Sequence, residues 1–151
     1  MIYIDTNVIV SYVDEKDPNH DKVVAMSMQL EEERIVSQLT LLELASIYAR
    51  AELEKPIPLA MYSIKRFGAS IVEADLNVVI KESLRYVPML RLKTLDLLHI
   101  TIANAVRAKS IITLDKDIAK KADVIKDTMG IEVITMSGLK PSASGNMGRL
   151  I

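Results

Sequence analysis

The first ten residues, MIYIDTNVIV (residues 1–10), decide the fold. An apolar run over residues 1–4 ends abruptly in Asp5-Thr6-Asn7, after which apolar residues resume. The run is typical of a buried strand, and the residues after it predict a short helix over Thr6–Val13. A carboxylate inside so apolar a stretch either caps that helix or belongs to an acidic site.

The composition limits the possible functions. The chain has 151 residues, of which 50% are hydrophobic and 26% are charged, as expected for one globular domain. Its net charge of −1 gives no overall attraction for polyanions, so nucleic acid would need a local basic patch or metal ions. The absence of cysteine excludes disulfides, thiolate zinc sites and a cysteine nucleophile.

Apolar runs alternate with stretches of helical period along the chain. This alternation predicts an α/β fold with a mostly parallel five-stranded sheet covered by helices on both faces. We expect one domain over residues 1–136, a loose tail over 137–151, and a cytoplasmic protein with no secretory signal and no membrane span. The predicted strands are 1–4, 35–38, 70–73, 110–114 and 132–135, and the predicted helices are 6–13, 20–33, 40–54, 59–67, 75–90, 96–108 and 116–127.

Four acidic residues lie at or near predicted helix starts. Asp5 follows the first strand, Glu43 lies in TLLEL after the second, Asp96 lies in the apolar stretch LKTLDLLHITIANA, and Asp115 follows the fourth strand. Because parallel strands end at one edge of a sheet, we expect Asp5 and Asp115 to converge there, with Glu43 reaching in.

Each acid also has a purely structural interpretation. Asp5 and Asp115 are suitable helix N-caps, Thr40 and Glu43 fit a capping box, and Asp96 suits the helix dipole after a Thr94 N-cap.

A set of converging carboxylates would need neutralisation, because the like charges repel one another and raise their pKa values. No Lys or Arg lies beside Asp5, Glu43 or Asp96 in a position to do so. Mg²⁺ or Mn²⁺ prefers oxygen ligands and accepts shared carboxylates, so a divalent cation is the better explanation of the set.

The stretches MIYIDTNVIV, TLLELASIYAR, LKTLDLLHITIANA and SIITLDKDIAKKA together resemble the PIN-domain family, specifically the VapC-like toxins of toxin–antitoxin pairs. The resemblance covers the chain to about residue 136. It implies a three-layer α/β/α domain that binds Mg²⁺ or Mn²⁺ in an acidic cluster and hydrolyses RNA. It also implies a VapB-like antitoxin as partner and a homodimer.

The resemblance assigns the metal-site positions to Asp5, Glu43, Asp96 and Asp115. It implies that Thr6 hydrogen-bonds into the site and that Thr113 orients the fourth acid. Asp117 is the further catalytic candidate, as an acid that supports the first ion or binds a second one.

Other residues are open to two interpretations. His99 lies one turn after Asp96 but on an apolar helix, which favours a packed, hydrogen-bonded histidine over a ligand. The basic residues near the acids either contact the RNA backbone or form ordinary solvated helix faces; these are Arg50, Lys55, Lys116, Lys120 and Lys121.

Two alternatives to the toxin remain open: a PIN nuclease of RNA processing outside a toxin pair, and a nonenzymatic RNA-binding or assembly module. A haloacid-dehalogenase-type enzyme is disfavoured because Asn7 stands where it needs a second Asp. A dinucleotide-binding or P-loop enzyme is excluded because all five glycines lie beyond residue 67.

Overall fold

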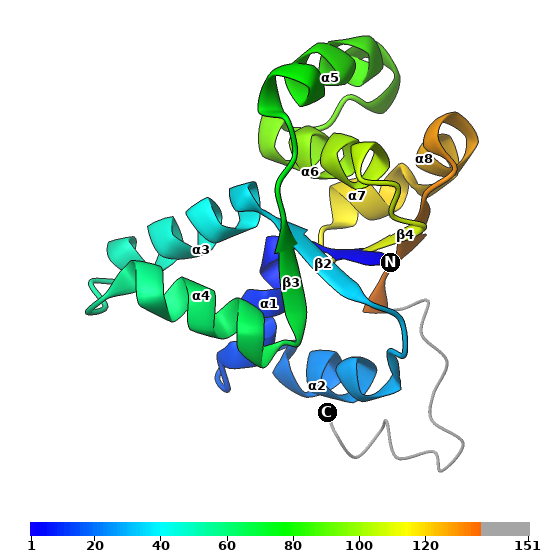
Figure 1. Cartoon of the computed structure of the whole chain (residues 1–151). Coiled ribbons are helices and arrows are strands. Elements are labelled where there is room, and N and C mark those ends of the chain that lie inside the picture. The colour runs from blue at the N-terminus through cyan, green and yellow to red at the C-terminus, as the bar shows by residue number, and fades with distance from the viewer. Residues whose placement is uncertain (137–151) are drawn as a thin grey trace.

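A computed structural model describes residues 1–136, so the predicted tail over 137–151 lies outside the described residues. Within this range the chain forms five strands and eight helices (Figure 1). The elements in chain order are β1 (Ile2–Ile4), α1 (Thr6–Val13), α2 (His20–Gln29), β2 (Arg34–Ser37), α3 (Gln38–Arg50), α4 (Pro56–Arg66), β3 (Ala69–Val72), α5 (Leu76–Leu90), α6 (Thr94–Ala105), β4 (Ser110–Ile112), α7 (Lys116–Lys120), α8 (Ala122–Met129) and β5 (Glu132–Ile134).

The strands form one parallel sheet in the order β3-β2-β1-β4-β5. The chain therefore builds the sheet outward from β1 in one direction through β2 and β3, and then in the other through β4 and β5. This confirms the predicted five-stranded α/β sheet, with every described pairing parallel. The reversal of direction makes the carboxyl ends of β1 and β4 the switch point, where ligands bind in folds of this type.

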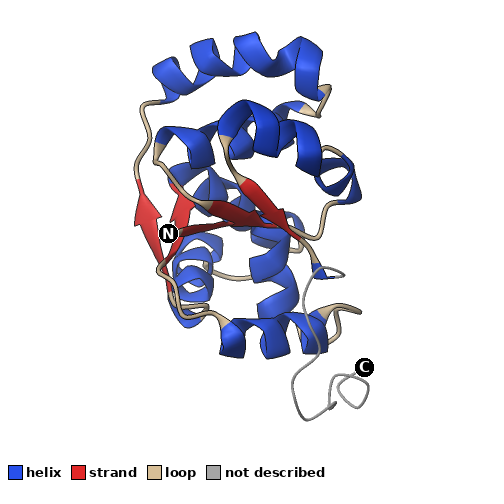
Figure 2. Cartoon of the chain, turned by 90° about the vertical axis from the view of Figure 1, so that its right-hand side faces the viewer, coloured by secondary structure: helices blue, strands red, loops and turns tan. Residues whose placement is uncertain are grey.

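Helices cover both faces of the sheet, which gives the predicted three layers (Figures 1 and 2). One face packs against α5, α6 and α8, and its buried cluster includes Tyr3, Ile100 and Ile111. The other face packs against α1 to α4, and its cluster includes Ile4, Leu44 and Phe67. Successive strand residues such as Tyr3 and Ile4 point to opposite faces, so both clusters are built from apolar runs.

Two helix boundaries differ from the sequence-based expectation for identifiable reasons. The helix expected over residues 20–33 ends at Gln29, and the Arg34 guanidinium donates to the Ser27 carbonyl in its last turn. The glutamates that follow are also unfavourable at the negative end of a helix dipole. The helix expected over 116–127 is two helices, α7 and α8, with Lys121 between them.

The starts of two other helices decide what the acids do. Helix α3 begins at Gln38 with Ser37 as its N-cap, and the capping box pairs Ser37 with Thr40 rather than Thr40 with Glu43. Helix α6 begins at Thr94 with Lys93 as its N-cap, which places Asp96 in the first turn. Glu43 therefore has no capping role.

No helix within residues 1–136 has both the length and the apolar character needed to cross a membrane.

Candidate metal and nucleic-acid site

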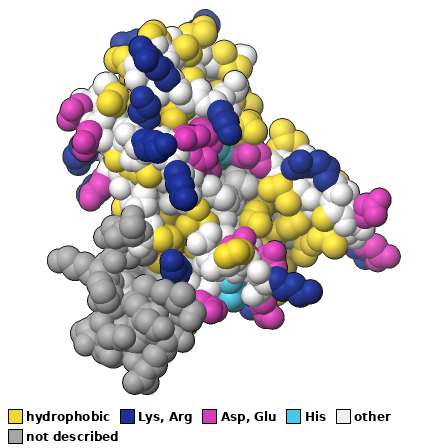
Figure 3. Space-filling view, turned by 180° about the vertical axis from the view of Figure 1, so that it is seen from behind, with side chains coloured by type: hydrophobic (Ala, Val, Ile, Leu, Met, Phe, Trp, Pro, Cys, Tyr) yellow, Lys and Arg dark blue, Asp and Glu magenta, His cyan; other side chains and the backbone are white. Residues whose placement is uncertain are grey.

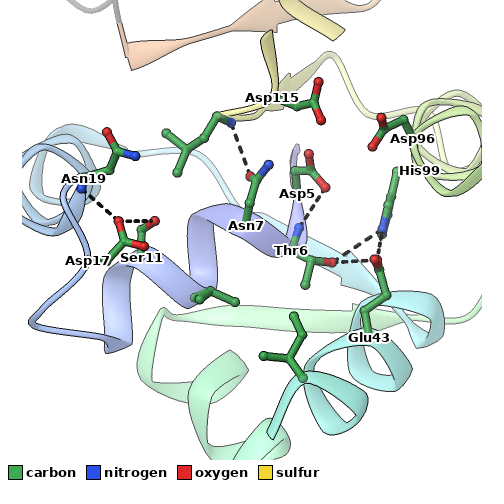
Figure 4. Close-up of a pocket in the computed structure, with 13 residues that line it drawn as sticks. Asp5, Thr6, Asn7, Ser11, Asp17, Asn19, Glu43, Asp96, His99 and Asp115 are labelled. Carbon is green, nitrogen blue, oxygen red and sulfur yellow. Dashed lines mark hydrogen bonds and ion pairs between the residues drawn. The ribbon is translucent and has the colours of Figure 1, made fainter. Parts of the chain in front are cut away.

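A polar pocket of about 500 Å³ lies at the switch point of the sheet (Figure 4). This volume is within the range of ordinary ligand sites. Elements distant in sequence form its walls, including α1, α3, α6 and the segment after β4. Its lining residues are Asp5, Thr6, Asn7, Val10, Ser11, Asp17, Asn19, Glu43, Ile47, Asp96, His99, Leu114 and Asp115.

Three of the predicted acids face one another on one side of this pocket. Asp5 comes from the end of β1, Asp115 from the segment after β4, and Asp96 from the first turn of α6 (Figure 4). Burial raises the pKa of Asp5 above its ordinary value. Burial, followed by the charges of Asp115 and Asp5, raises the pKa of Asp96 from 3.8 to about 6. The three carboxylates therefore form one electrostatically coupled cluster.

Two threonines hold the cluster in place. The Asp5 side chain is only 4% exposed, and its Oδ1 accepts the Thr6 backbone N–H at 2.9 Å. The buried Thr113 Oγ1 donates to Asp5 Oδ2 at 2.7 Å and accepts the Asp115 backbone N–H at 2.9 Å. Thr113 thus connects the first acid to the fourth, whereas the resemblance implied only that it orients the fourth.

Asp115 and Asp96 differ in how much of each carboxylate is occupied. Asp115 caps α7, because its Oδ1 accepts the backbone N–H groups of Asp117 and Ile118 at 2.7 and 3.2 Å. Its Oδ2 accepts no hydrogen bond from the described residues. The Asp96 carboxylate likewise receives none from residues 1–136, although it is half-buried. Both acids therefore keep oxygens available to a ligand.

Glu43, the fourth predicted acid, is turned toward His99 and Thr6 (Figure 4). Its Oε1 accepts Thr6 Oγ1 at 2.9 Å and contacts His99 Nε2 directly. Burial alone would raise the pKa of Glu43, but the hydrogen bond and charge of His99 lower it. The glutamate is thus an ionised carboxylate at the edge of the three-acid cluster.

The donor set fits a hard divalent cation. All four predicted ligands offer carboxylate oxygens, and no Lys or Arg within residues 1–136 lines the pocket to neutralise them. In that same range, no three His, Cys, Asp or Glu side chains already lie close enough to hold one ion. An ion would therefore draw the carboxylates together and offset the burial and the mutual repulsion that raise the pKa of Asp96.

Some site residues were missed by the sequence reasoning. Asn7, Ser11, Asp17 and Asn19 line the pocket on the side away from Glu43. The Asp17 Oδ1 accepts Ser11 Oγ and the Asn19 backbone N–H, a pattern ordinary in turns. Of these residues, only Asn7 could have been predicted from the sequence, because it lies two residues after Asp5.

Asp117 lies apart from the cluster. Its side chain is exposed on α7 and does not line the pocket. Its backbone N–H donates to Asp115 Oδ1, and its side chain makes no hydrogen bond to the described residues. The role predicted for it, as a further catalytic acid, stays a prediction without geometric support.

Basic side chains border the acidic pocket. Figure 3 shows Lys and Arg around a patch of acidic side chains with a histidine beside it. Lys22 and Lys116 line a neighbouring hollow that shares Asn19 and Asp115 with the pocket, and Arg50 shares another hollow with Glu43. Lys55, Lys120 and Lys121 line none of these hollows.

The fold is similar to that of several solved proteins. Solved structures of similar fold include Mycobacterium tuberculosis VapC20, a sarcin-ricin loop cleaving toxin, at TM-score 0.66 and 10% identity, covering 80% of this chain and 94% of that one. VapBC-1 from nontypeable Haemophilus influenzae has a TM-score of 0.65 at 18% identity and covers 91% and 99%. FitAcB from Neisseria gonorrhoeae has a TM-score of 0.64 at 18% identity and covers 92% and 100%.

A search of curated proteins finds no match. The model of the PIN domain family, in contrast, matches residues 2–124, a range that holds every predicted site residue. The chain therefore belongs to the PIN-domain family, as its acidic motifs indicated.

Proposed function

We propose that this protein is a divalent-cation-dependent endoribonuclease that acts as the toxin of a VapBC-type pair. The observation that carries the proposal is the cluster of Asp5, Asp96 and Asp115, which face one another in a pocket that no Lys or Arg of the described residues lines. Membership of the PIN-domain family and the fold shared with VapC20 support the choice of RNA as substrate.

Asp5, Glu43, Asp96 and Asp115 would hold the cation, Mg²⁺ or Mn²⁺. When bound, the ion supplies positive charge that offsets the charge of the scissile phosphate and lowers the pKa of water. Asp5 is fixed by Thr6 and Thr113 and gives the site a rigid wall. Asp96, whose carboxylate has no hydrogen bond to the described residues, is the group best able to accept a proton from the attacking water.

The border of the pocket would bind the RNA backbone. Lys22 and Lys116 lie in the hollow next to Asp115, so a phosphate beside the scissile one can meet positive charge there. The acidic floor repels RNA in the absence of the cation, so substrate binding and cleavage both depend on it. Arg50 offers a second positive contact near Glu43.

The direct test is cleavage of a mixed RNA pool by the full chain with Mg²⁺ or Mn²⁺, and with chelator. Asp5→Asn and Asp96→Asn remove site carboxylates, and Asp127→Asn is a matched control on an exposed face of α8. We expect cation-dependent cutting that is lost in both site variants and kept in the control. If both site variants still cut RNA, or if cutting continues in the presence of chelator, the proposal is contradicted.

The toxin assignment is separable from the nuclease assignment. The family resemblance implies a VapB-like antitoxin and a homodimer, and both belong to the proposal. If the purified chain cleaves RNA but its expression leaves bacterial growth unaffected, an RNA-processing nuclease is the better assignment. If the chain neither cleaves RNA nor binds a cation but still binds RNA, the nonenzymatic RNA-binding module is the better assignment.

A further inference from the structure

A buried chain of hydrogen bonds links the centre of the sheet to Glu43. The Tyr3 hydroxyl lies 2.8 Å from Ser37 Oγ and 2.7 Å from His99 Nδ1. The other ring nitrogen, His99 Nε2, contacts Glu43 Oε1. Tyr3 and Ser37 are 0% exposed and His99 is 1% exposed, so the hydrogen bonds are shielded from water up to Glu43, which lines the pocket. Tyr3 comes from β1, Ser37 from β2 and His99 from α6, and they meet Glu43 of α3.

The hydrogen-bonding capacities of these groups fix the orientation of the histidine. An ionised carboxylate only accepts hydrogen bonds, so Nε2 must carry the proton that faces Glu43. Tyr and Ser hydroxyls both donate and accept. Tyr3 can therefore donate to an unprotonated Nδ1 or accept from a protonated one, and Ser37 satisfies the hydroxyl in either case. The Nε2–H bond to Glu43 is thus present whichever charge the ring carries.

The contacts to Glu43 all converge on one of its two oxygens. Thr6 Oγ1 and His99 Nε2 both bind Oε1, whereas Oε2 accepts no hydrogen bond from residues 1–136. Asp115 shows the same division, with Oδ1 bonded to two backbone N–H groups and Oδ2 left over. Carboxylates held through one oxygen present the other as a ligand in a defined direction.

We propose that His99, anchored by Tyr3, is a positioning residue that orients Glu43 as a ligand for the divalent cation. The inference rests on the proposed function, because it assumes that the pocket takes up a cation. His99 itself is not a ligand in this arrangement, since both ring nitrogens are already engaged with Tyr3 and Glu43. It acts through Glu43, and it connects the affinity of the site to the packing of the core.

The positioning role of His99 is tested by substitutions that place a hydrogen-bond donor near one or the other nitrogen of its ring. His99→Gln puts an amide near the position of Nε2, His99→Asn puts it near Nδ1, and His99→Leu supplies no donor. The affinity of the full chain for Mn²⁺ is measured by titration calorimetry, with thermal unfolding as the check that each variant folds. We expect His99→Asn and His99→Leu to weaken Mn²⁺ binding by about 10- to 100-fold, and His99→Gln to recover most of the loss.

A role limited to packing predicts a different pattern. The three variants would then lose affinity in proportion to their loss of thermal stability, with no recovery in His99→Gln, and that result would overturn the inference. Tyr3→Phe keeps the aromatic packing but removes the anchor of the ring. We expect Tyr3→Phe to weaken Mn²⁺ binding severalfold, and this variant provides the test if the His99 variants fail to fold. An unchanged Mn²⁺ affinity of Tyr3→Phe would also overturn the inference.

A spectroscopic measurement distinguishes failure of this inference from failure of the proposed function. The chain has two histidines, so nitrogen-15 spectra of His20→Gln report on His99 alone. Without metal, we expect a proton on Nε2 that exchanges slowly and shifts when Glu43 is changed to Ala. If His20→Gln shows this signal but the wild type binds no Mn²⁺, the cation site fails while the His99–Glu43 contact stands. An Nε2 that lacks this proton overturns the inference itself.

Discussion

Replacing Asp96 by Asn is expected to stabilise the metal-free protein. Burial and the charges of Asp115 and Asp5 raise the pKa of Asp96 from 3.8 to about 6, so the folded state disfavours the charged form. The full shift corresponds to at most about 3 kcal/mol. Because the side chain is only half-buried, solvent screening reduces this to about 1 kcal/mol. In a domain of this size, that amounts to a rise in Tm of about 3 °C.

The sign of the effect depends on pH. A carboxyl whose folded pKa lies above its unfolded pKa binds more protons in the folded state, so stability is lost as pH rises from about 4 to 6. The wild type carries this penalty at pH 7.5, whereas Asp96→Asn does not. Below about pH 4 both side chains are neutral, and the difference between the two proteins should disappear.

Cation binding should reverse the order of stability. A ligand at 100 times its Kd stabilises the folded state by about 2.7 kcal/mol, and Asp96→Asn removes one of the groups that hold the ion. The assay is thermal unfolding of both proteins at pH 7.5, with chelator and with saturating Mn²⁺, and Asp127→Asn as control. Destabilisation by Asp96→Asn in chelator, or an equal Mn²⁺ gain in both proteins, would refute the reasoning.

Three further predictions follow from the site. Thr113→Val removes the buried donor to Asp5, so we expect a loss of about 1–3 kcal/mol in unfolding free energy and weaker Mn²⁺ binding. Chemical denaturation measures the stability and calorimetry measures the Mn²⁺ affinity, and an unchanged affinity would contradict this prediction. Asp117→Asn changes an exposed side chain outside the pocket, so RNA cleavage should stay within about threefold of wild type, the scale of a change worth under 1 kcal/mol; a loss as large as that of Asp96→Asn would restore its predicted catalytic role. Expression of the wild-type chain should arrest bacterial growth while Asp96→Asn does not, and arrest by both proteins at equal abundance would separate toxicity from the acidic cluster.

Much of the fold was predictable because apolar periodicity reports burial directly. The run before Asp5 and the run at residues 110–112 read as fully buried strands, and they pair in parallel at the centre of the sheet. The helix ends were less predictable, because they depend on contacts distant in sequence. Arg34, for example, binds the Ser27 carbonyl in the last turn of α2, seven residues earlier, and also binds the Phe67 carbonyl.

Asp5 and Asp115 were predictable from their positions after strands, and Thr6 and Thr113 were expected from the family resemblance. The contact between His99 and Glu43 was not predicted. His99 was assigned to the core because its helix is apolar, and it is indeed 1% exposed. A buried position did not indicate that its ring reaches Glu43, which lies 56 residues away in sequence. Only the folded chain brings Tyr3, 96 residues from His99, to the other side of the ring.

The capping interpretation and the site interpretation turned out to be compatible at two positions. Asp115 caps α7 through one oxygen and keeps the other, and Asp5 accepts a backbone N–H while facing the cluster. Glu43 has no capping role, because the capping box of α3 pairs Ser37 with Thr40. Asp96 lies in the first turn of α6, so its expected favourable position in the helix dipole is retained, although the N-cap is Lys93 rather than Thr94. The local patterns could not separate these cases, since both uses favour an acid at a helix start.

The most direct test of the account is to locate Mn²⁺ by anomalous diffraction in crystals of the full chain grown or soaked with the ion. We expect a peak among the carboxylates of Asp5, Asp96 and Asp115, within ligand distance of at least two of them, and no such peak in Asp96→Asn crystals. A wild-type crystal saturated with Mn²⁺ that shows no peak in this pocket, or shows its peak elsewhere, would contradict it.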